Sequence, residues 1–203
     1  MGEAKVMSHS FGSLDRREAV KALLADRKDL LVVTGLGSPS YDVFAAGEHD
    51  GNFYLWGAMG GAAMVGLGLA LAQPKRPVVV VTGDGEQMMG LGSLLTVAVR
   101  KPRNFTVAVL DNGHFGETGM QLSHSGLGVR LSVIAQGAGF PSVTEIVDLD
   151  GIADYRPRLH SLSDGPRFAR IKIAPGNPER VLPPRDGVFV KSRFRKNLGY
   201  SVS

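Results

Sequence analysis

Two short triplets, Gly83-Asp84-Gly85 and Asp111-Asn112-Gly113, each come just after a run of mostly apolar residues. The runs at residues 78–81 and 104–110 predict two buried strands, and residues 87–100 between them have the length and apolar spacing of a helix. A strand–helix–strand unit of this size makes its two strands parallel neighbours. Both triplets are therefore expected at the same carboxyl edge of one sheet.

This placement brings one carboxylate and one side-chain amide together where open α/β sheets bind their ligands. Asp84 and Asn112 offer hard oxygen donors of the kind that suit Mg²⁺ holding a phosphorylated cofactor. A lone Gly-Asp-Gly also occurs in ordinary turns, and a plain turn of a Rossmann-like sheet is the alternative. The spacing, the strand before each triplet and the helix between them favour the cofactor site.

The remaining pattern predicts a single-domain α/β protein with a parallel sheet and helices on both faces, because strands alternate with helices along the chain. Further strands are expected at residues 30–33, 53–56, 142–147 and 168–173, with a loop over 34–40. Further helices are expected after a candidate N-cap at Ser13, at residues 57–71 and 130–137, and from Asp148 or Asp150 into Leu159. Three segments are expected: a flexible N-terminus over 1–12, the cofactor-binding domain over 13–175, and a basic, Pro-containing tail over 176–203.

Composition narrows the function classes. The formal net charge is +4, and much of the excess lies in the tail, at Lys191, Arg193, Arg195 and Lys196. We interpret this as a solvated tail, with contact to an acidic partner as the alternative. The sequence has no basic stripe with interleaved aromatic residues, so nucleic-acid binding is not expected. No apolar run reaches about 18 residues, so no membrane span is expected. The chain has no cysteine and no signal-peptide core, and a cytoplasmic location is the default.

The two triplets resemble the motif of the diphosphate-binding (PP) domain of thiamine diphosphate (ThDP) enzymes. The resemblance implies a ThDP–Mg²⁺ site in which Asp84, Asn112 and the backbone carbonyl of His114 ligate the metal. It extends over roughly residues 15–175 and is strongest to the group that contains the sulfopyruvate decarboxylase β subunit and phosphonopyruvate decarboxylase. The segments that carry it are residues 17–20, 37–40, 55–62, 66–71, 91–95 and 111–119.

Carried over residue by residue, the resemblance also implies how the cofactor is held. Backbone N–H groups of Gly85, Glu86, Glu117 and Thr118 would cradle the diphosphate, as glycine-rich turns do. Ser38 either reaches the same diphosphate or makes a hydrogen bond within its own loop. The implied set of cofactor residues is completed by Gly57, Ala58, Met59, Gly83, Phe115 and Gly116.

Two of these residues have specific implied roles. Met59 corresponds to the apolar wedge between the two cofactor rings, and an ordinary core methionine is the alternative. The carbonyl of Gly57 would accept a hydrogen bond from the aminopyrimidine. The chain departs from the family pattern at Ala58, where Ser is usual, at Glu86, where a small residue is usual, and over residues 119–123. These departures leave the substrate's side group open.

No catalytic acid–base residue is identified. His124 is a weak candidate for protonating the product carbanion, and a surface histidine is the simpler interpretation. The family needs a glutamate that contacts the pyrimidine ring and belongs to a separate pyrimidine-binding domain. This chain has no length left for such a domain, so we expect a hetero-oligomer with a pyrimidine-domain partner chain.

The resemblance implies a carbon–carbon lyase subunit that decarboxylates a small anionic 2-oxo acid, such as a sulfonated or phosphonated pyruvate. An acetolactate-synthase-like carboligase or lyase subunit is one alternative, and a non-catalytic cofactor-binding module is another. A nicotinamide dehydrogenase is disfavoured because no G-x-G-x-x-G follows the first expected strand.

Overall fold

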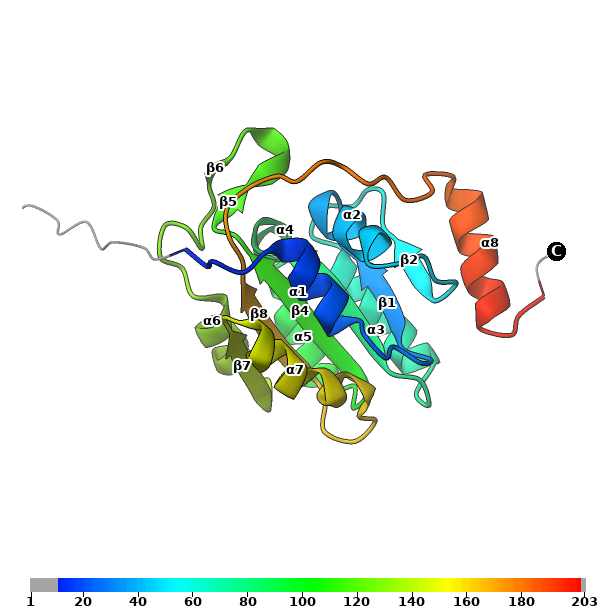
Figure 1. The fold of residues 1–203 in the computed structure, drawn as a ribbon. Coiled ribbons are helices and arrows are strands. Elements are labelled where there is room, and N and C mark those ends of the chain that lie inside the picture. Colours follow the sequence, from blue (N-terminus) through cyan, green and yellow to red (C-terminus); the bar gives the residue numbers. More distant parts are fainter. Residues whose placement is uncertain (1–10, 202–203) are drawn as a thin grey trace, which may run out of the picture.

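A six-stranded sheet forms the centre of the computed structural model, which describes residues 11–201. Its strand order is β2-β1-β3-β4-β8-β7, and every neighbouring pair is parallel. The strands are β1 Leu31–Thr34, β2 Asn52–Tyr54, β3 Val78–Gly83, β4 Phe105–Asp111, β7 Ser142–Ile146 and β8 Arg167–Lys172. Figure 1 shows the sheet between two layers of helices. The predicted fold class is confirmed.

The helices are α1 Arg16–Leu23, α2 Ser38–Ala45, α3 Ala62–Ala72, α4 Asp84–Met89, α5 Gly92–Arg100, α6 Leu131–Ala138, α7 Leu149–Tyr155 and α8 Gly187–Asn197. A small antiparallel hairpin, β5 His114–Phe115 with β6 Gln121–Leu122, surrounds the 3₁₀ turn η1 Gly116–Thr118, and η2 Arg156–His160 follows α7. No helix of the described residues is long and apolar enough to cross a membrane.

The core has two halves because side chains alternate across a strand. Val79 and Val81 of β3 pack with residues of α1, α2 and α7, whereas Val78 and Val80 pack with residues of α3, α5 and α6. All four valines are fully buried. This run of valines therefore forms a central strand that is covered on both faces, as parallel sheets require.

Strands β3 and β4 end together, since Gly83 at the end of β3 is paired in register with Leu110 of β4. Asp84, which follows β3, and Asp111, the last residue of β4, therefore lie side by side at this edge. The expectation that both triplets lie at one carboxyl edge is confirmed.

The helices before and after β3 differ from the prediction. Residues 87–100 do not form one helix: α4 begins at Asp84, directly after the strand, and α5 begins at Gly92. The break follows from a close backbone approach, because a Cβ on Gly90 would lie 2.0 Å from the carbonyl oxygen of Gly60. Residues 57–61 form a turn rather than helix, and Ala58 there has a φ of +54°.

Two helices were not predicted. Residues 34–40 were expected as a loop, but α2 begins within them at Ser38, and a proline in the first helical turn is favourable. The second is α8, inside the expected tail. Its Phe194 is buried and packs edge-on against Phe53, with ring centroids 5.4 Å apart.

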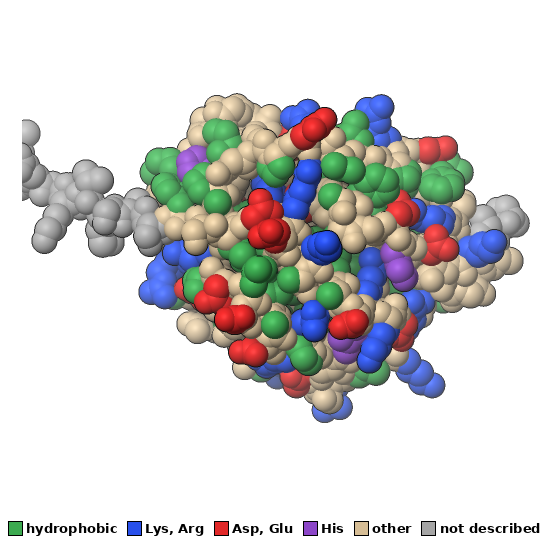
Figure 2. All heavy atoms as spheres, viewed as in Figure 1, with side chains coloured by type: hydrophobic (Ala, Val, Ile, Leu, Met, Phe, Trp, Pro, Cys, Tyr) green, Lys and Arg blue, Asp and Glu red, His purple; other side chains and the backbone are tan. Residues whose placement is uncertain are grey.

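The solvated-tail interpretation is wrong for Arg193 of α8, whose side chain is 11% exposed and lies 2.9 Å from a carboxylate oxygen of Glu48. Figure 1 shows α8 beside β2, at one end of the sheet. The expected flexible segment over 1–12 lies mostly outside the described residues. Figure 2 shows acidic and basic side chains interspersed on the face covered by α1 and α7.

Candidate functional site

A hollow of about 80 Å³ lies at the carboxyl edge of β3 and β4. It is lined by every residue of the predicted cofactor set except Gly57 and Ala58. The lining residues are Arg16, Leu36, Ser38, Pro39, Met59, Gly83, Asp84, Gly85, Glu86, Leu110, Asn112, His114, Phe115, Gly116, Glu117 and Thr118. Residues from five separate segments of the sequence thus meet at one edge of the sheet.

Asp84, the first residue of α4, is a buried acid with 1% of its surface exposed. Burial, and then the nearby charge of Asp111, raise the pKa of Asp84 to about 6. The hydroxyl of Ser123 donates a hydrogen bond to its Oδ2. A carboxylate that is buried beside a second acid is the arrangement that a bound cation would relieve.

Asn112 and His114 form a tight turn after β4. The Oδ1 of Asn112 accepts a hydrogen bond from the backbone N–H of His114 (3.0 Å), and the intervening Gly113 has a φ of +69°. The Nδ1 of His114 lies 2.7 Å from the carbonyl oxygen of Asn112. The side chain of His114 is therefore tied to its own turn rather than aimed at a reaction centre.

The donor set fits a hard cation. Asp84 supplies a carboxylate, Asn112 supplies an amide oxygen, and the turn supplies backbone carbonyl oxygens. Mg²⁺ prefers oxygen donors of these kinds. Among residues 11–201, no group of three or more His, Cys, Asp or Glu side chains is placed to hold a metal. A metal at this edge therefore depends on amide and carbonyl oxygens in addition to Asp84.

The hollow also suits an anionic group. Helices α2 and α4 both begin at it, at Ser38 and Asp84, and neither has a side-chain N-cap. Uncapped backbone N–H groups at helix starts favour phosphates. A Cβ on Gly85 would lie 2.7 Å from the ring of Phe115, so only glycine fits beside this ring.

The charges that line the hollow are three acids, Asp84, Glu86 and Glu117, and one guanidinium, Arg16. Arg16 is itself buried and bound to Asp42, with Nε 2.7 Å from Oδ2. A diphosphate would meet net repulsion here unless a divalent cation accompanied it. The electrostatics therefore favour a metal–diphosphate pair over a free anion.

Glu86 is turned into the protein. Its side chain is 4% exposed, and Thr82 donates a hydrogen bond of 2.7 Å to its Oε2. Burial raises the pKa of Glu86. A Cβ on Gly35 would lie 1.7 Å from Oε2, so the glycine makes room for this carboxyl group. The larger side chain at this position is thus accommodated in the wall of the hollow by the space beside Gly35.

Met59 is 39% exposed and lines the hollow, which does not fit an ordinary core methionine. The hydroxyl of Ser38 donates to Oε1 of Glu117 (3.0 Å), and Arg180 pairs with Oε2 of the same carboxylate (3.0 Å). Thus the hydroxyl of Ser38 holds a loop in this structure, and the charge of Glu117 is balanced by the segment after β8.

His124 lies outside the hollow, although its ring contacts one of the predicted residues that line it. It is exposed, does not line the hollow, and its ring packs edge-on against Phe115 at a centroid distance of 6.1 Å. The sequence interpretation missed four lining residues, Arg16, Leu36, Pro39 and Leu110. Leu110 was signalled by its place at the end of an apolar strand, but the position of Arg16 depends on how α1 packs against α2, where Arg16 pairs with Asp42.

Comparisons with known proteins agree with this geometry. The family described as "Thiamine pyrophosphate enzyme, C-terminal TPP binding domain" matches residues 43–161. The sulfopyruvate decarboxylase subunit beta of Methanothermobacter thermautotrophicus is 35% identical over 91% of this chain and 96% of its own length. The phosphonopyruvate decarboxylase of Streptomyces viridochromogenes is 40% identical over 89% of this chain but only 45% of its own length.

Solved structures share the fold. A putative thiamin diphosphate-dependent enzyme from Mycobacterium smegmatis superimposes with a TM-score of 0.66 at 24% identity, over 86% of this chain and 37% of that one. A 2-oxoglutarate:ferredoxin oxidoreductase from Magnetococcus marinus gives 0.64 at 16% identity, over 95% and 78%. Thiamine pyrophosphate is another name for ThDP, and this chain belongs to the thiamine pyrophosphate enzymes through their C-terminal TPP binding domain.

Proposed function

We propose that this chain is the diphosphate-binding subunit of a Mg²⁺- and ThDP-dependent decarboxylase. Its substrate would be a small anionic 2-oxo acid of the sulfopyruvate or phosphonopyruvate type, as the names of its relatives suggest. The observation that carries the proposal is the meeting of Asp84 and Asn112 beside two uncapped helix starts.

In this proposal Asp84, Asn112 and the carbonyl of His114 hold Mg²⁺. The backbone N–H groups of Gly85 and Glu86 bind the diphosphate, with those of Glu117 and Thr118 as further donors. When bound, ThDP supplies the electron sink that allows a 2-oxo acid to lose CO₂. The chain's own task is to anchor the phosphorylated end of the cofactor and to fix its direction.

Two further residues would shape the bound cofactor. Met59 would fill the space between the two rings, because an apolar side chain occupies volume without competing for protons. Gly57 would offer its carbonyl to the aminopyrimidine, and its lack of a side chain permits that approach. Gly57 lies outside the hollow's lining, so this contact requires that the cofactor extend beyond it toward a second chain.

The proposal includes a separate pyrimidine-domain partner. The chain spans nearly all of a relative named subunit beta, but about half the length of the phosphonopyruvate decarboxylases that it matches. Two acids between β1 and β2 are already engaged: Asp42 of α2 is paired with Arg16, and Glu48 of the loop after α2 is paired with Arg193. The carboxylate that activates the pyrimidine ring would therefore come from the partner.

A candidate docking surface lies on helices α3 and α5, which pack beside each other on one face of the sheet. We call it the α3–α5 surface, and define it by the exposed side chains of Met64, Val65, Leu71, Leu95 and Val99. Val99 is 78% exposed and Leu95 is 60% exposed. Grouped exposed apolar side chains of this kind favour a protein–protein contact.

A substrate screen on the assembled complex tests the reaction. CO₂ release should be measured with sulfopyruvate, phosphonopyruvate and pyruvate, each with and without an acceptor aldehyde. The proposal expects release from sulfopyruvate or phosphonopyruvate without need of an acceptor. Release only together with a carbon–carbon condensation product would support a carboligase, and no turnover in a complex that binds ThDP would support a cofactor-binding module.

A further inference from the structure

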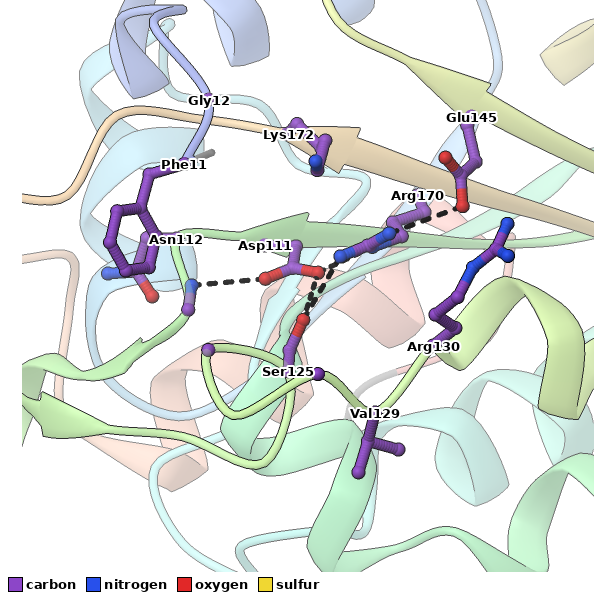
Figure 3. A pocket seen from close by; sticks show the side chains of 13 residues that line it. Phe11, Gly12, Asp111, Asn112, Ser125, Val129, Arg130, Glu145, Arg170 and Lys172 are labelled. Atoms are coloured by element: carbon purple, nitrogen blue, oxygen red, sulfur yellow. Dashed lines mark hydrogen bonds and ion pairs between the residues drawn. The ribbon is translucent and has the colours of Figure 1, made fainter. Parts of the chain in front are cut away.

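Asp111, which directly precedes the candidate metal ligand Asn112, is held by three hydrogen bonds. Its Oδ2 accepts from Nε of Arg170 (2.5 Å) and from the hydroxyl of Ser125 (2.5 Å). Its Oδ1 accepts from the backbone N–H of Gly113 (3.0 Å). Figure 3 shows these groups converging at the end of β4. Both carboxylate oxygens are therefore engaged, and one of them fixes the turn that carries Asn112.

Arg170 extends this arrangement across the sheet. Its Nη1 lies 3.2 Å from Glu145 of β7, and its Nη2 donates to the hydroxyl of Ser125 (3.1 Å). Glu145 also accepts from Ser132 of α6 at 2.5 Å. The guanidinium fork thus joins β4, β7, β8 and the loop that carries Ser125, which a single ammonium group could not do in the same geometry.

These groups are buried but lie apart from the candidate cofactor hollow. Asp111 is 4% exposed, and Arg170 and Ser125 are 8% exposed. All three line a neighbouring hollow of about 390 Å³, shown in Figure 3, and none of them lines the hollow that contains Asp84. A buried ion pair adds little net stability compared with apolar side chains, and its best-attested benefit is to fix one arrangement.

The loop that carries Ser125 returns to the first triplet. Ser123, two residues earlier, donates its hydroxyl to Asp84, and its backbone N–H donates to the carbonyl of Gly113 (2.8 Å). A Cβ on Gly126 would lie 2.2 Å from the same carbonyl oxygen. One loop is therefore packed onto the turn at Gly113 and bonded to an aspartate at each end.

We infer that Arg170 and Asp111, with Ser125, form a positioning unit for the metal. The unit fixes the turn so that the amide oxygen of Asn112 and the carbonyl of His114 face the ion together with Asp84. None of the three residues of the unit would touch the metal or the cofactor. The inference rests on the proposed function, because it assumes that Mg²⁺ binds at Asp84 and Asn112.

A Mn²⁺ titration tests this unit in the full chain assembled with its partner at saturating ThDP. Binding is measured as the loss of the EPR signal of free Mn²⁺. Ser125→Ala removes one bond to Asp111, and Arg170→Lys keeps the charge but loses the fork. Each should weaken Mn²⁺ binding about 10–100-fold, as losses behind a metal ligand do. Turnover at saturating Mn²⁺ should return close to that of the wild type.

Two controls separate the possible failures. Arg130→Gln removes another arginine that lines the same neighbouring hollow but is not among the groups hydrogen-bonded to Asp111, and it should leave Mn²⁺ affinity unchanged. Asp84→Ala should abolish Mn²⁺ binding. If the wild type does not bind Mn²⁺, the proposed function fails. If Asp84→Ala abolishes binding but folded Ser125→Ala binds as tightly as the wild type, the positioning unit is refuted, whether or not Arg170→Lys folds.

Discussion

The hydroxyl of Ser123 donates a hydrogen bond to the carboxylate of Asp84, which lies 39 positions earlier in the sequence. Ser123 is fully buried, and Asp84 is 1% exposed. The bond orients a carboxylate at the edge of the sheet, where β3 ends and α4 begins. The acidic ligand of the candidate metal site is therefore oriented by the loop that carries Ser123, which follows the second triplet in the sequence.

Replacing this carboxylate should disable cofactor binding without unfolding the chain. Asp84→Asn keeps the shape of the side chain but leaves a hard cation without its anionic ligand. ThDP affinity at saturating Mg²⁺ should fall by about tenfold or more, as measured by calorimetric titration of the assembled complex. Unchanged affinity would remove Asp84 from the metal ligands.

The same substitution should stabilise the metal-free chain at neutral pH. The pKa of Asp84 is raised from 3.8 to about 6, so the folded state holds this proton more tightly than the unfolded state. Stability is therefore lost as the pH rises between about 4 and 6, where the unfolded state has already released the proton. Asp84→Asn cannot lose a proton and escapes this loss.

Urea unfolding in EDTA measures the effect as a difference between the two proteins. Asp84→Asn should have the larger free energy of unfolding at pH 7.5, and the difference should shrink toward zero as the pH falls to about 3, where Asp84 is largely neutral in both states. A difference that is the same at both pH values would show that the charge of Asp84 carries no such penalty.

Met59→Ala should slow turnover while leaving stability nearly unchanged. The side chain is 39% exposed in this chain, so truncation lacks the penalty of about 2–5 kcal/mol that a buried methionine would carry. Loss of the wedge should appear as a lower kcat in the complex at a melting temperature close to that of the wild type. A large fall in melting temperature with a normal kcat would assign Met59 to the core instead.

The α3–α5 surface should be required for assembly. Val99→Glu places a charge on a side chain that is 78% exposed, so the isolated chain should fold normally. Affinity for the partner chain should nevertheless fall at least about tenfold, because a charge at a desolvated contact is unfavourable. Val147→Glu, at another exposed valine, is the matched control. Equal partner affinity in both variants would place the contact elsewhere.

The sheet and the edge that holds the site were predictable because their signals are local. Residues 78–81 form an unbroken apolar run, and each triplet stands directly at a strand end. Parallel pairing then brings Asp84 and Asn112 together without further information. The expected lining of the hollow followed from the resemblance of these triplets to a known motif.

The parts that were missed depend on tertiary contacts. Arg16 reaches the hollow through tertiary contacts, because α1 packs against α2 and Arg16 pairs with Asp42 of that helix, and no pattern around it signals that place. The basic composition of the last segment concealed α8, which is anchored by Phe194 packing against Phe53. The helix expected from residue 57 begins later, at Ala62, because the backbone of Gly60 lies against Gly90, between α4 and α5.

The dependence of catalysis on a second chain is the central claim, and CO₂ release tests it most directly. This chain, a pyrimidine-domain partner and their mixture should each be assayed with sulfopyruvate and phosphonopyruvate at saturating ThDP and Mg²⁺. The account predicts negligible release from either chain alone and turnover only in the mixture. Full activity from this chain alone would contradict it, because the activating carboxylate would then lie within residues 1–203.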